Sequence, residues 1–275
     1  MSDLRGKTIV MSGGSRGIGL AIALRAARDG ANVALLAKTA EPHPRLQGTI
    51  HTAAEEIEGA GGQALPIVGD VRDDDVVADA VQRAAERFGG IDVVVNNASA
   101  IDVSPSTTIA MRRYDLMQDV NTRGTFLLSR TCVPYLREAA NPHVLTLSPP
   151  LSLDPKWFGG HLAYTLAKFG MSMCTLGMAA EHADAGIAFN SLWPRTLVAT
   201  AAVQNLLGGD AAMARSRKPE IVADAAHHIL TRPARTTTGN FFIDDEVLAD
   251  AGVTDLSGYA YVPDADLQVD LFLDG

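Results

Sequence analysis

The stretch KTIVMSGGSRGIGLAIALRAARDG, residues 7–30, decides the fold. Its first part, KTIVMSG (7–13), is a short apolar run that ends in glycine, as a buried strand does. Its second part, GIGLAIALRAARDG (17–30), has the apolar spacing of a helix, and Gly30 stands where a helix commonly ends. A buried strand that leads through glycines into an amphipathic helix is typical of the opening unit of an α/β fold.

The same alternation continues along the chain. Strand-like apolar runs occupy residues 32–37, 64–71, 91–99, 143–148, 187–194 and 239–245. Helical patterns occupy residues 49–62, 72–90, 121–139 and 161–184. Continuous apolar strands between amphipathic helices predict a parallel sheet covered by helices on both faces. We therefore expect one doubly wound α/β domain of the Rossmann type over residues 1–275, with no internal repeat or linker.

Composition excludes several classes of function. Of the 275 residues, 47% are hydrophobic and 20% are charged, which is typical of a globular protein. The formal net charge of -9, without a basic block, argues against nucleic acid and anionic membranes as partners. No apolar run approaches the ~18 residues of a membrane span, and the N-terminus is not a signal sequence. We expect a cytoplasmic protein with two buried free thiols, Cys132 and Cys174, and no metal site.

A glycine-rich loop, SGGSRGIG (12–19), lies between the first strand and the first helix. Glycine leaves room for a phosphate to approach the backbone, and the N–H groups at a helix N-terminus attract negative charge. A lone glycine motif is weak, but the junction of strand and helix is the context that supports a phosphate site. We expect this loop to bind a dinucleotide through Gly13, Ser15, Arg16, Gly17, Ile18 and Gly19.

The residues after the second strand indicate which dinucleotide binds. An acidic residue there would bind the ribose 2′-hydroxyl of NAD(H), but the chain reads Ala37–Lys38. Lys38 and Arg16 together suit a 2′-phosphate, which carries about two negative charges. The sequence therefore favours NADP(H) over NAD(H). Asp70 and Val71, at the end of the third strand, are expected to meet the adenine.

Taken together, these residues resemble the short-chain dehydrogenase/reductase family. The resemblance covers the glycine loop, Asp70, NNAS (96–99), Asn121 in VNTRG and Tyr164-x-x-x-Lys168. Separated motifs in the right order are far more specific than any one of them. Two further segments, SPPLSLDPKWF (148–158) and FNSLWPRT (189–196), resemble one branch of the family, whose human member continues into a sterol-carrier-like domain. From its end at DLFLDG, we expect this chain to be a stand-alone dehydrogenase domain.

The resemblance implies hydride transfer between a nicotinamide and a carbonyl or alcohol. Tyr164 and Lys168 share a helix face, so the ammonium and the cofactor's positive charge would lower the pKa of the phenol and make it a general acid/base. Lys168 would also hold the ribose hydroxyls, and Asn121 would position a water. The resemblance also assigns cofactor contacts to Asn97, Ala98, Ser99, Tyr164, Lys168, Pro194 and Thr196. By analogy, it implies a homodimer or homotetramer.

The chain departs from the family pattern at the serine that usually contacts the substrate oxygen. Pro149 occupies the usual serine position, and proline has no side-chain donor. Two hydroxyls remain nearby, Ser148 at the end of the strand and Ser152 behind it. We favour Ser148; Ser152 is the alternative, and if neither points inward the substrate oxygen is weakly stabilised.

A second departure is Arg195, which replaces a glycine that usually follows Pro194. It either meets an anionic group of the substrate or forms a salt bridge with surface acids. Residues 195–220 are interpreted as a substrate lid, with an ordinary surface helix as the alternative. The substrate is expected to be a small apolar, lipid- or steroid-like molecule, contacted by Trp157, Phe158, Trp193, Leu197 and methionines unless these serve the core. The alternative function is an NADP(H)-binding sensor or scaffold with little turnover.

Overall fold

The fold was examined in a computed structural model, which describes residues 3–42 and 48–274. Within these residues, seven parallel strands form one sheet in the order β3-β2-β1-β4-β5-β6-β7. The strands are β1 (Thr8–Ser12), β2 (Asn32–Ala37), β3 (Gln63–Val68), β4 (Val93–Asn96), β5 (His143–Thr146), β6 (Ala188–Trp193) and β7 (Phe241–Ile243). The strand order reverses direction between β1 and β4, which makes this a doubly wound sheet.

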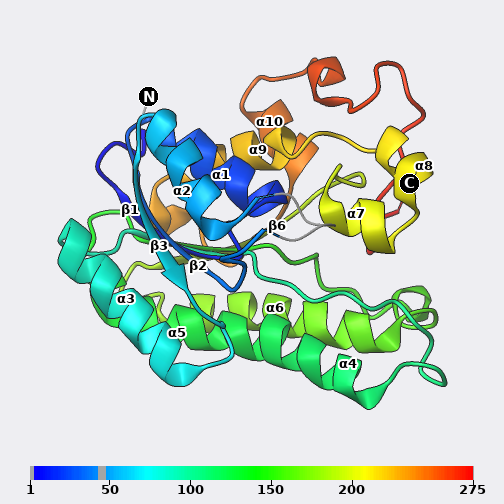
Figure 1. Cartoon of the computed structure of the whole chain (residues 1–275), viewed down its shortest axis with the longest axis horizontal. Coiled ribbons are helices and arrows are strands. Elements are labelled where there is room, and N and C mark those ends of the chain that lie inside the picture. The colour runs from blue at the N-terminus through cyan, green and yellow to red at the C-terminus, as the bar shows by residue number, and fades with distance from the viewer. Residues whose placement is uncertain (1–2, 43–47, 275) are drawn as a thin grey trace.

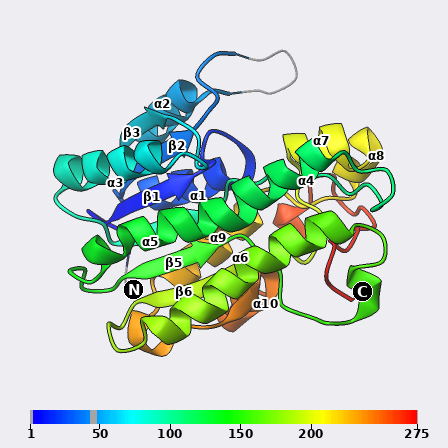
Figure 2. The same ribbon diagram turned by 90° about the horizontal axis from the view of Figure 1, so that it is seen from below.

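Helices cover both faces of the sheet (Figure 1). One face carries α1 (Gly17–Ala27), α2 (Ile50–Gly59), α9 (Glu220–Leu230) and α10 (Asp244–Asp250). The other carries α3 (Asp74–Phe88), α4 (Met111–Met117), α5 (Gly124–Leu136) and α6 (Leu162–Glu181), and Figure 2 shows α6 running alongside the long helix that α4 and α5 form end to end. Two short helices, α7 (Ala201–Leu206) and α8 (Gly209–Ala214), lie at one end of the sheet. Short 3₁₀ turns occur at Pro155–Trp157, Ala234–Thr236 and Ser257–Tyr259.

Local capping fixes several of these helix ends. At the start of α2, the Thr49 side chain accepts a hydrogen bond from the N–H of Thr52 (3.2 Å), and the Thr52 hydroxyl accepts one from the N–H of Thr49 (2.8 Å). Asp73 caps the first turn of α3, and Gly89 ends that helix with a φ of 85°. Local side chains therefore set where α2 begins and where α3 begins and ends.

The core lies on both sides of the sheet. Along β1, Ile9 and Met11 belong to the cluster beneath α1 and α9, whereas Val10 belongs to the cluster beneath α3 and α5. Because successive strand residues face opposite sides, both sides must be apolar, which explains the uninterrupted hydrophobic runs. The predicted α/β, doubly wound Rossmann-type fold is confirmed.

Two local features differ from the sequence-based expectation, and no expectation covered a third. The helix predicted at 121–139 is preceded by α4, and the two are joined by a π-helical turn, Gln118–Arg123. Cys132 is buried, but Cys174 is only partly buried. Residues 260–274 carry little regular structure, yet they return across the end of the sheet beside α6 and α8 (Figures 1 and 2).

The described residues bear on two kinds of site, a membrane span and a metal centre. No helix among them has the length and apolar character of a membrane span. They also hold no group of three or more His, Cys, Asp or Glu side chains that would suit a metal ion.

Candidate functional site

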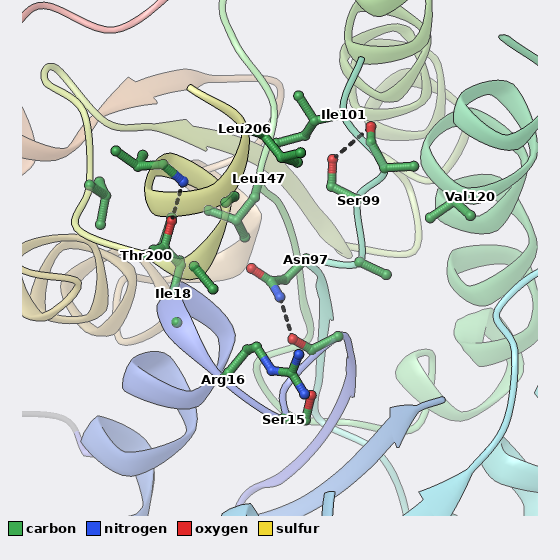
Figure 3. Close-up of a pocket in the computed structure, with 18 of the residues that line it drawn as sticks. Ser15, Arg16, Ile18, Asn97, Ser99, Ile101, Val120, Leu147, Thr200 and Leu206 are labelled. Atoms are coloured by element: carbon green, nitrogen blue, oxygen red, sulfur yellow. Dashed lines mark hydrogen bonds between the residues drawn. The ribbon is translucent and has the colours of Figure 1, made fainter. Parts of the chain in front are cut away.

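A cleft of about 770 Å³ opens at the carboxyl ends of the strands, where doubly wound sheets bind their ligands. Side chains from the glycine loop, from the segment after β4 and from α7 surround it (Figure 3). Predicted site residues that line it are Gly13, Ser15, Arg16, Gly17, Ile18, Lys38, Asp70, Val71, Asn97, Ala98, Ser99, Tyr164, Lys168 and Pro194. Gly19, Asn121, Ser148 and Thr196 are not among the lining residues.

The glycine loop is held against the end of β4. Gly13 has a φ of 73°, and a Cβ on it would lie 2.8 Å from the Cα of Ala98. The Asn97 side chain donates to the Gly13 carbonyl (2.7 Å), and the Ser12 hydroxyl accepts from the N–H groups of Asn97 and Ala98. Gly19 lies against the other side of this contact, and a Cβ there would lie only 2.5 Å from the Asn97 Nδ2. The loop thus needs glycine at both positions to keep its shape.

A cluster of charges lies where the adenosine end of a dinucleotide is expected. Lys38, at the end of β2, lies 3.4 Å from a carboxylate oxygen of Asp70. The Arg72 guanidinium donates to both oxygens of Asp70, and these hydrogen bonds hold the pKa of the carboxyl at about 2. Arg16 donates to the Gly48 carbonyl (2.8 Å), while its buried Nε has no partner among the described residues. The negative charge of Asp70 is therefore balanced by Arg72, which sequence reasoning missed.

Tyr164 and Lys168 lie one turn apart on α6 and face the cleft. Both are almost fully buried. The Lys168 Nζ donates to the Leu147 carbonyl (2.9 Å) and lies 5.2 Å from the centre of the Trp193 ring. Among the described residues, no side chain or backbone group hydrogen-bonds to the Tyr164 hydroxyl. The phenol oxygen is therefore available to a ligand in the cleft.

The protein groups around Tyr164 shift its pKa in the direction opposite to our expectation. Burial raises the pKa of the phenol well above its usual value of about 10, and the negative charge of Asp270 adds to the effect. Burial lowers the pKa of Lys168 to about 7, against the charge of Asp270, which acts to raise it. The protein alone thus keeps the phenol protonated, which is the form that can donate a proton.

Asn121 lies in the π-helical turn and is fully buried. Its Oδ1 accepts from the N–H of Ala100 (2.7 Å), and its Nδ2 donates to the Ala100 carbonyl (3.0 Å). Both ends of the side-chain amide are therefore committed to one backbone residue next to the cleft. The amide holds the segment after β4 in place rather than facing the cleft.

Neither candidate serine lines the cleft in the described structure. Ser148 is fully buried, and its hydroxyl pairs with that of Ser191 (2.9 Å), which in turn donates to Thr175 (2.9 Å). The Ser152 hydroxyl accepts from the N–H of Asp154 (3.2 Å) at an exposed position. The preference for Ser148 as the substrate contact gains no support from this geometry.

The second departure, Arg195, takes the salt-bridge alternative. Its side chain donates to Asp245 (3.2 Å) and pairs with Glu246, and its N–H donates to Asp244 (2.8 Å). Arg195 does not line the cleft, so it is not placed to meet an anionic substrate group. Thr196, expected to contact the cofactor, is buried and pairs through its backbone with Val269.

The apolar wall of the cleft differs in part from expectation. Trp193 and Leu197 line it, whereas Trp157 and Phe158 pack in a core cluster around Phe272, and no described methionine lines it. The predicted lid segment contributes α7 and the residues before it. Lining residues that the sequence did not indicate include Ile101, Leu116, Val120, Val198, Leu206, Asp270 and Leu271.

Comparison with known proteins identifies the family of this chain. A model of the short chain dehydrogenase family matches residues 7–209, a range that includes the glycine loop, Tyr164 and Lys168. The chain belongs to the short-chain dehydrogenase/reductase family. Residues after 209, including Asp270 and Leu271, lie outside that match.

Similar members of the family are known from several organisms. Hydroxysteroid dehydrogenase-like protein 2 of Xenopus laevis is 54% identical over 98% of this chain, and the human protein of that name is 52% identical over 98%. The chain spans 64% of the length of each of these relatives. The resemblance to this branch that the sequence predicts is therefore confirmed.

Solved structures of the family share the fold closely. A short chain dehydrogenase from Mycobacterium thermoresistibile superposes with a TM-score of 0.94 at 61% identity, covering 99% of this chain and 96% of that one. A Xanthomonas campestris protein superposes with a TM-score of 0.96 at 56% identity, covering 99% of this chain and 100% of that one. A metagenomic short-chain oxidoreductase in complex with NADP superposes with a TM-score of 0.71 at 25% identity, covering 87% of this chain and 97% of that one.

Proposed function

We propose that this short-chain dehydrogenase reduces a carbonyl group of a small apolar, lipid- or steroid-like molecule with NADPH, with Tyr164 as the proton donor. The observation that carries the proposal is that Tyr164 and Lys168 face the same cleft as the glycine loop. Bound NADPH would supply the hydride to the carbonyl carbon, and Tyr164 would give its proton to the carbonyl oxygen. The protonated phenol is the form that can give this proton.

The residues of the cleft fit a dinucleotide. The first turn of α1 offers backbone N–H groups beside a loop in which a Cβ on Gly13 would clash with Ala98. The Nε of Arg16, which has no partner among the described residues, and the ammonium of Lys38 suit a 2′-phosphate. The neighbour solved in complex with NADP supports the same choice.

Reversal of the charge at Lys38 tests the preference for NADPH. Lys38→Glu is expected to weaken NADPH binding about 10- to 100-fold while changing NADH binding little, because a contact between charged groups contributes about 1.5–3 kcal/mol. Fluorescence titration of both cofactors measures the two dissociation constants. Arg83→Glu, an exposed charge reversal on α3, is the control. An equal effect on NADH and NADPH would contradict the assignment of Lys38 to the 2′-phosphate.

The apolar character of the substrate is inferred from the wall of the cleft and from the relatives. Ile101, Leu116, Val120 and Leu206 line the cleft. The name of the relatives, hydroxysteroid dehydrogenase-like, points to the same class of molecule. We propose that α7 and α8, which overlap the segment 195–220, act as the lid over this part of the cleft. NADPH consumption with a panel of aldehydes, ketones and steroid-like ketones tests the proposal.

A second function, an NADP(H)-binding sensor or scaffold, is favoured by one observation. Neither Ser148 nor Ser152 lines the cleft, so the hydroxyl donor that the family pattern leads us to expect is missing there. Tight NADPH binding without turnover on any member of the panel would support this function. Turnover that disappears in Tyr164→Phe would support the dehydrogenase.

We also propose a homodimer or homotetramer formed through α5 and α6. Apolar side chains on these two neighbouring helices are exposed: Phe126, Leu162, Leu166, Met173 and Leu176. The double variant Leu166→Glu/Leu176→Glu should weaken assembly at least about 100-fold, because burying an unpaired carboxylate costs several kcal/mol. Sedimentation velocity measures the change. Leu153→Glu, at an exposed leucine outside the helices, should assemble as the wild type does, and a monomeric wild type would contradict the proposal.

A further inference from the structure

Residues 269–271 of the C-terminal segment are held by hydrogen bonds to the residues at and after the end of β6. They lie close to the reacting groups, Tyr164 and Lys168. Val269 forms an antiparallel bridge with Thr196, and the N–H of Asp270 donates to the Arg195 carbonyl (3.0 Å). One residue further on, the indole N–H of Trp193 donates to the Leu271 carbonyl (2.8 Å). Asp270 is therefore held between fixed contacts on both sides.

Phe272 packs the C-terminal segment against α6. Its φ is 73°, a value that is rare for a bulky residue and that persists only where the surroundings enforce it. Its ring lies 6.1 Å from the Tyr164 ring and 5.3 Å from the Phe169 ring, centre to centre. It also packs against Trp193 (5.9 Å). The segment is thus built against the helix that carries Tyr164 and Lys168.

The Asp270 side chain lines the cleft together with Tyr164 and Lys168, and it interacts electrostatically with both. Its Oδ1 accepts from the N–H of Leu271 (2.7 Å). No described residue hydrogen-bonds to its Oδ2, and no described cation lies within salt-bridge distance of the carboxyl. With no partner among the described residues, Oδ2 is left for a ligand of the cleft that Asp270 lines.

The cleft needs a donor for the substrate oxygen, and the serines do not supply one. We propose that the carboxyl of Asp270, in its protonated form, donates a hydrogen bond from Oδ2 to the substrate's carbonyl oxygen. The inference rests on the proposed carbonyl reduction. Asp270 would stabilise the negative charge that develops on that oxygen, while Tyr164 delivers the proton. The carboxyl keeps its own proton throughout, so the balance of the reaction is unchanged.

The surroundings favour the protonated carboxyl near neutral pH. Burial raises the pKa of Asp270 to about 7, and the charge of Asp244 acts in the same direction. The N–H of Leu271 and the ammonium of Lys168 act to lower it. Tyr164 faces it from α6, and the nearby Arg195 guanidinium is already paired with Asp245 and Glu246. A carboxyl kept neutral in apolar surroundings is an effective hydrogen-bond donor, and this ability is lost as the pH rises through about 7.

Two substitutions at Asp270 distinguish loss of the hydrogen-bond donor from loss of the carboxyl's ability to ionise. Asp270→Leu removes the donor and is expected to lower kcat for reduction about 100-fold, with the NADPH dissociation constant changed less than about twofold. Asp270→Asn keeps a donor that does not titrate, so its kcat should stay within about tenfold of the wild type. The wild-type kcat should fall from pH 6 to pH 8, and the fall should be smaller in Asp270→Asn, where Lys168 still titrates near 7. Asp264→Asn, an exposed position in the same segment, is the control.

A wild-type kcat in Asp270→Leu, or an unchanged pH profile in Asp270→Asn, would overturn the proposal. A measurement that does not need turnover tests the Asp270 donor separately from the proposed carbonyl reduction. Carbon NMR of the NADPH complex, with labelled aspartate and with Asp270→Asn to assign the signal, follows the ionisation directly. A protonated carboxyl above pH 6 supports the donor even if no substrate in the panel reacts. A carboxylate that persists down to pH 5 overturns it even if the enzyme is active.

Discussion

Tyr164→Phe is expected to lower kcat for carbonyl reduction by about 10²- to 10⁴-fold, the usual contribution of a positioned general acid. The variant removes one oxygen and leaves the ring, so packing against Phe272 and His161 is preserved. Because the hydroxyl has no hydrogen-bond partner among the described residues, its loss should leave no buried group unsatisfied. NADPH consumption under saturating cofactor measures the effect.

Cofactor binding serves as the internal check on Tyr164→Phe. The NADPH dissociation constant should stay close to that of the wild type, since Lys168 and the glycine loop are untouched. Tyr261→Phe, an exposed tyrosine in the C-terminal segment, should retain full activity. Retention of more than about a tenth of the wild-type kcat by Tyr164→Phe would show that another group delivers the proton.

The fold could be predicted from the sequence where local patterns decide it. The strand predicted at 32–37 coincides with β2, because every residue of that run is buried in the sheet. By contrast, α4 is only seven residues long and has no side-chain cap, so no start signal marks it. The π-helical turn that carries Asn121 has no cap either, and the backbone of Ala100 provides the partner for its amide.

The candidate site could be predicted only in part, because only some of its residues are marked by local sequence signals. Glycines at a strand-to-helix junction and a tyrosine one turn before a lysine are local signals. The direction of the Ser148 side chain is set by Ser191, which belongs to the next strand of the sheet. Asp270 reaches the cleft only because distant residues, Trp193 and Thr196, bind the segment around it. Contacts of this kind leave no periodic pattern in the sequence.

Gly19→Ala tests whether the glycine loop is held as described. A methyl group there would lie 2.5 Å from the Asn97 Nδ2 and 2.7 Å from the Gly13 carbonyl oxygen. Those two atoms share a hydrogen bond of 2.7 Å, so neither can retreat without breaking it. We expect a loss of about 1–3 kcal/mol in the free energy of unfolding, as for other overpacked sites. Thermal unfolding measures it.

The same substitution should also weaken the nucleotide site. The broken Asn97–Gly13 contact frees the loop whose N–H groups would bind the diphosphate, so NADPH affinity should fall together with stability, by at least about tenfold. Gly59→Ala at the end of α2, where a Cβ would meet nothing within 4 Å, should change neither quantity appreciably. If Gly19→Ala bound NADPH as tightly as Gly59→Ala does, the loop would tolerate movement away from β4. The close approach of Gly13 to Ala98 would then not be what shapes the phosphate site.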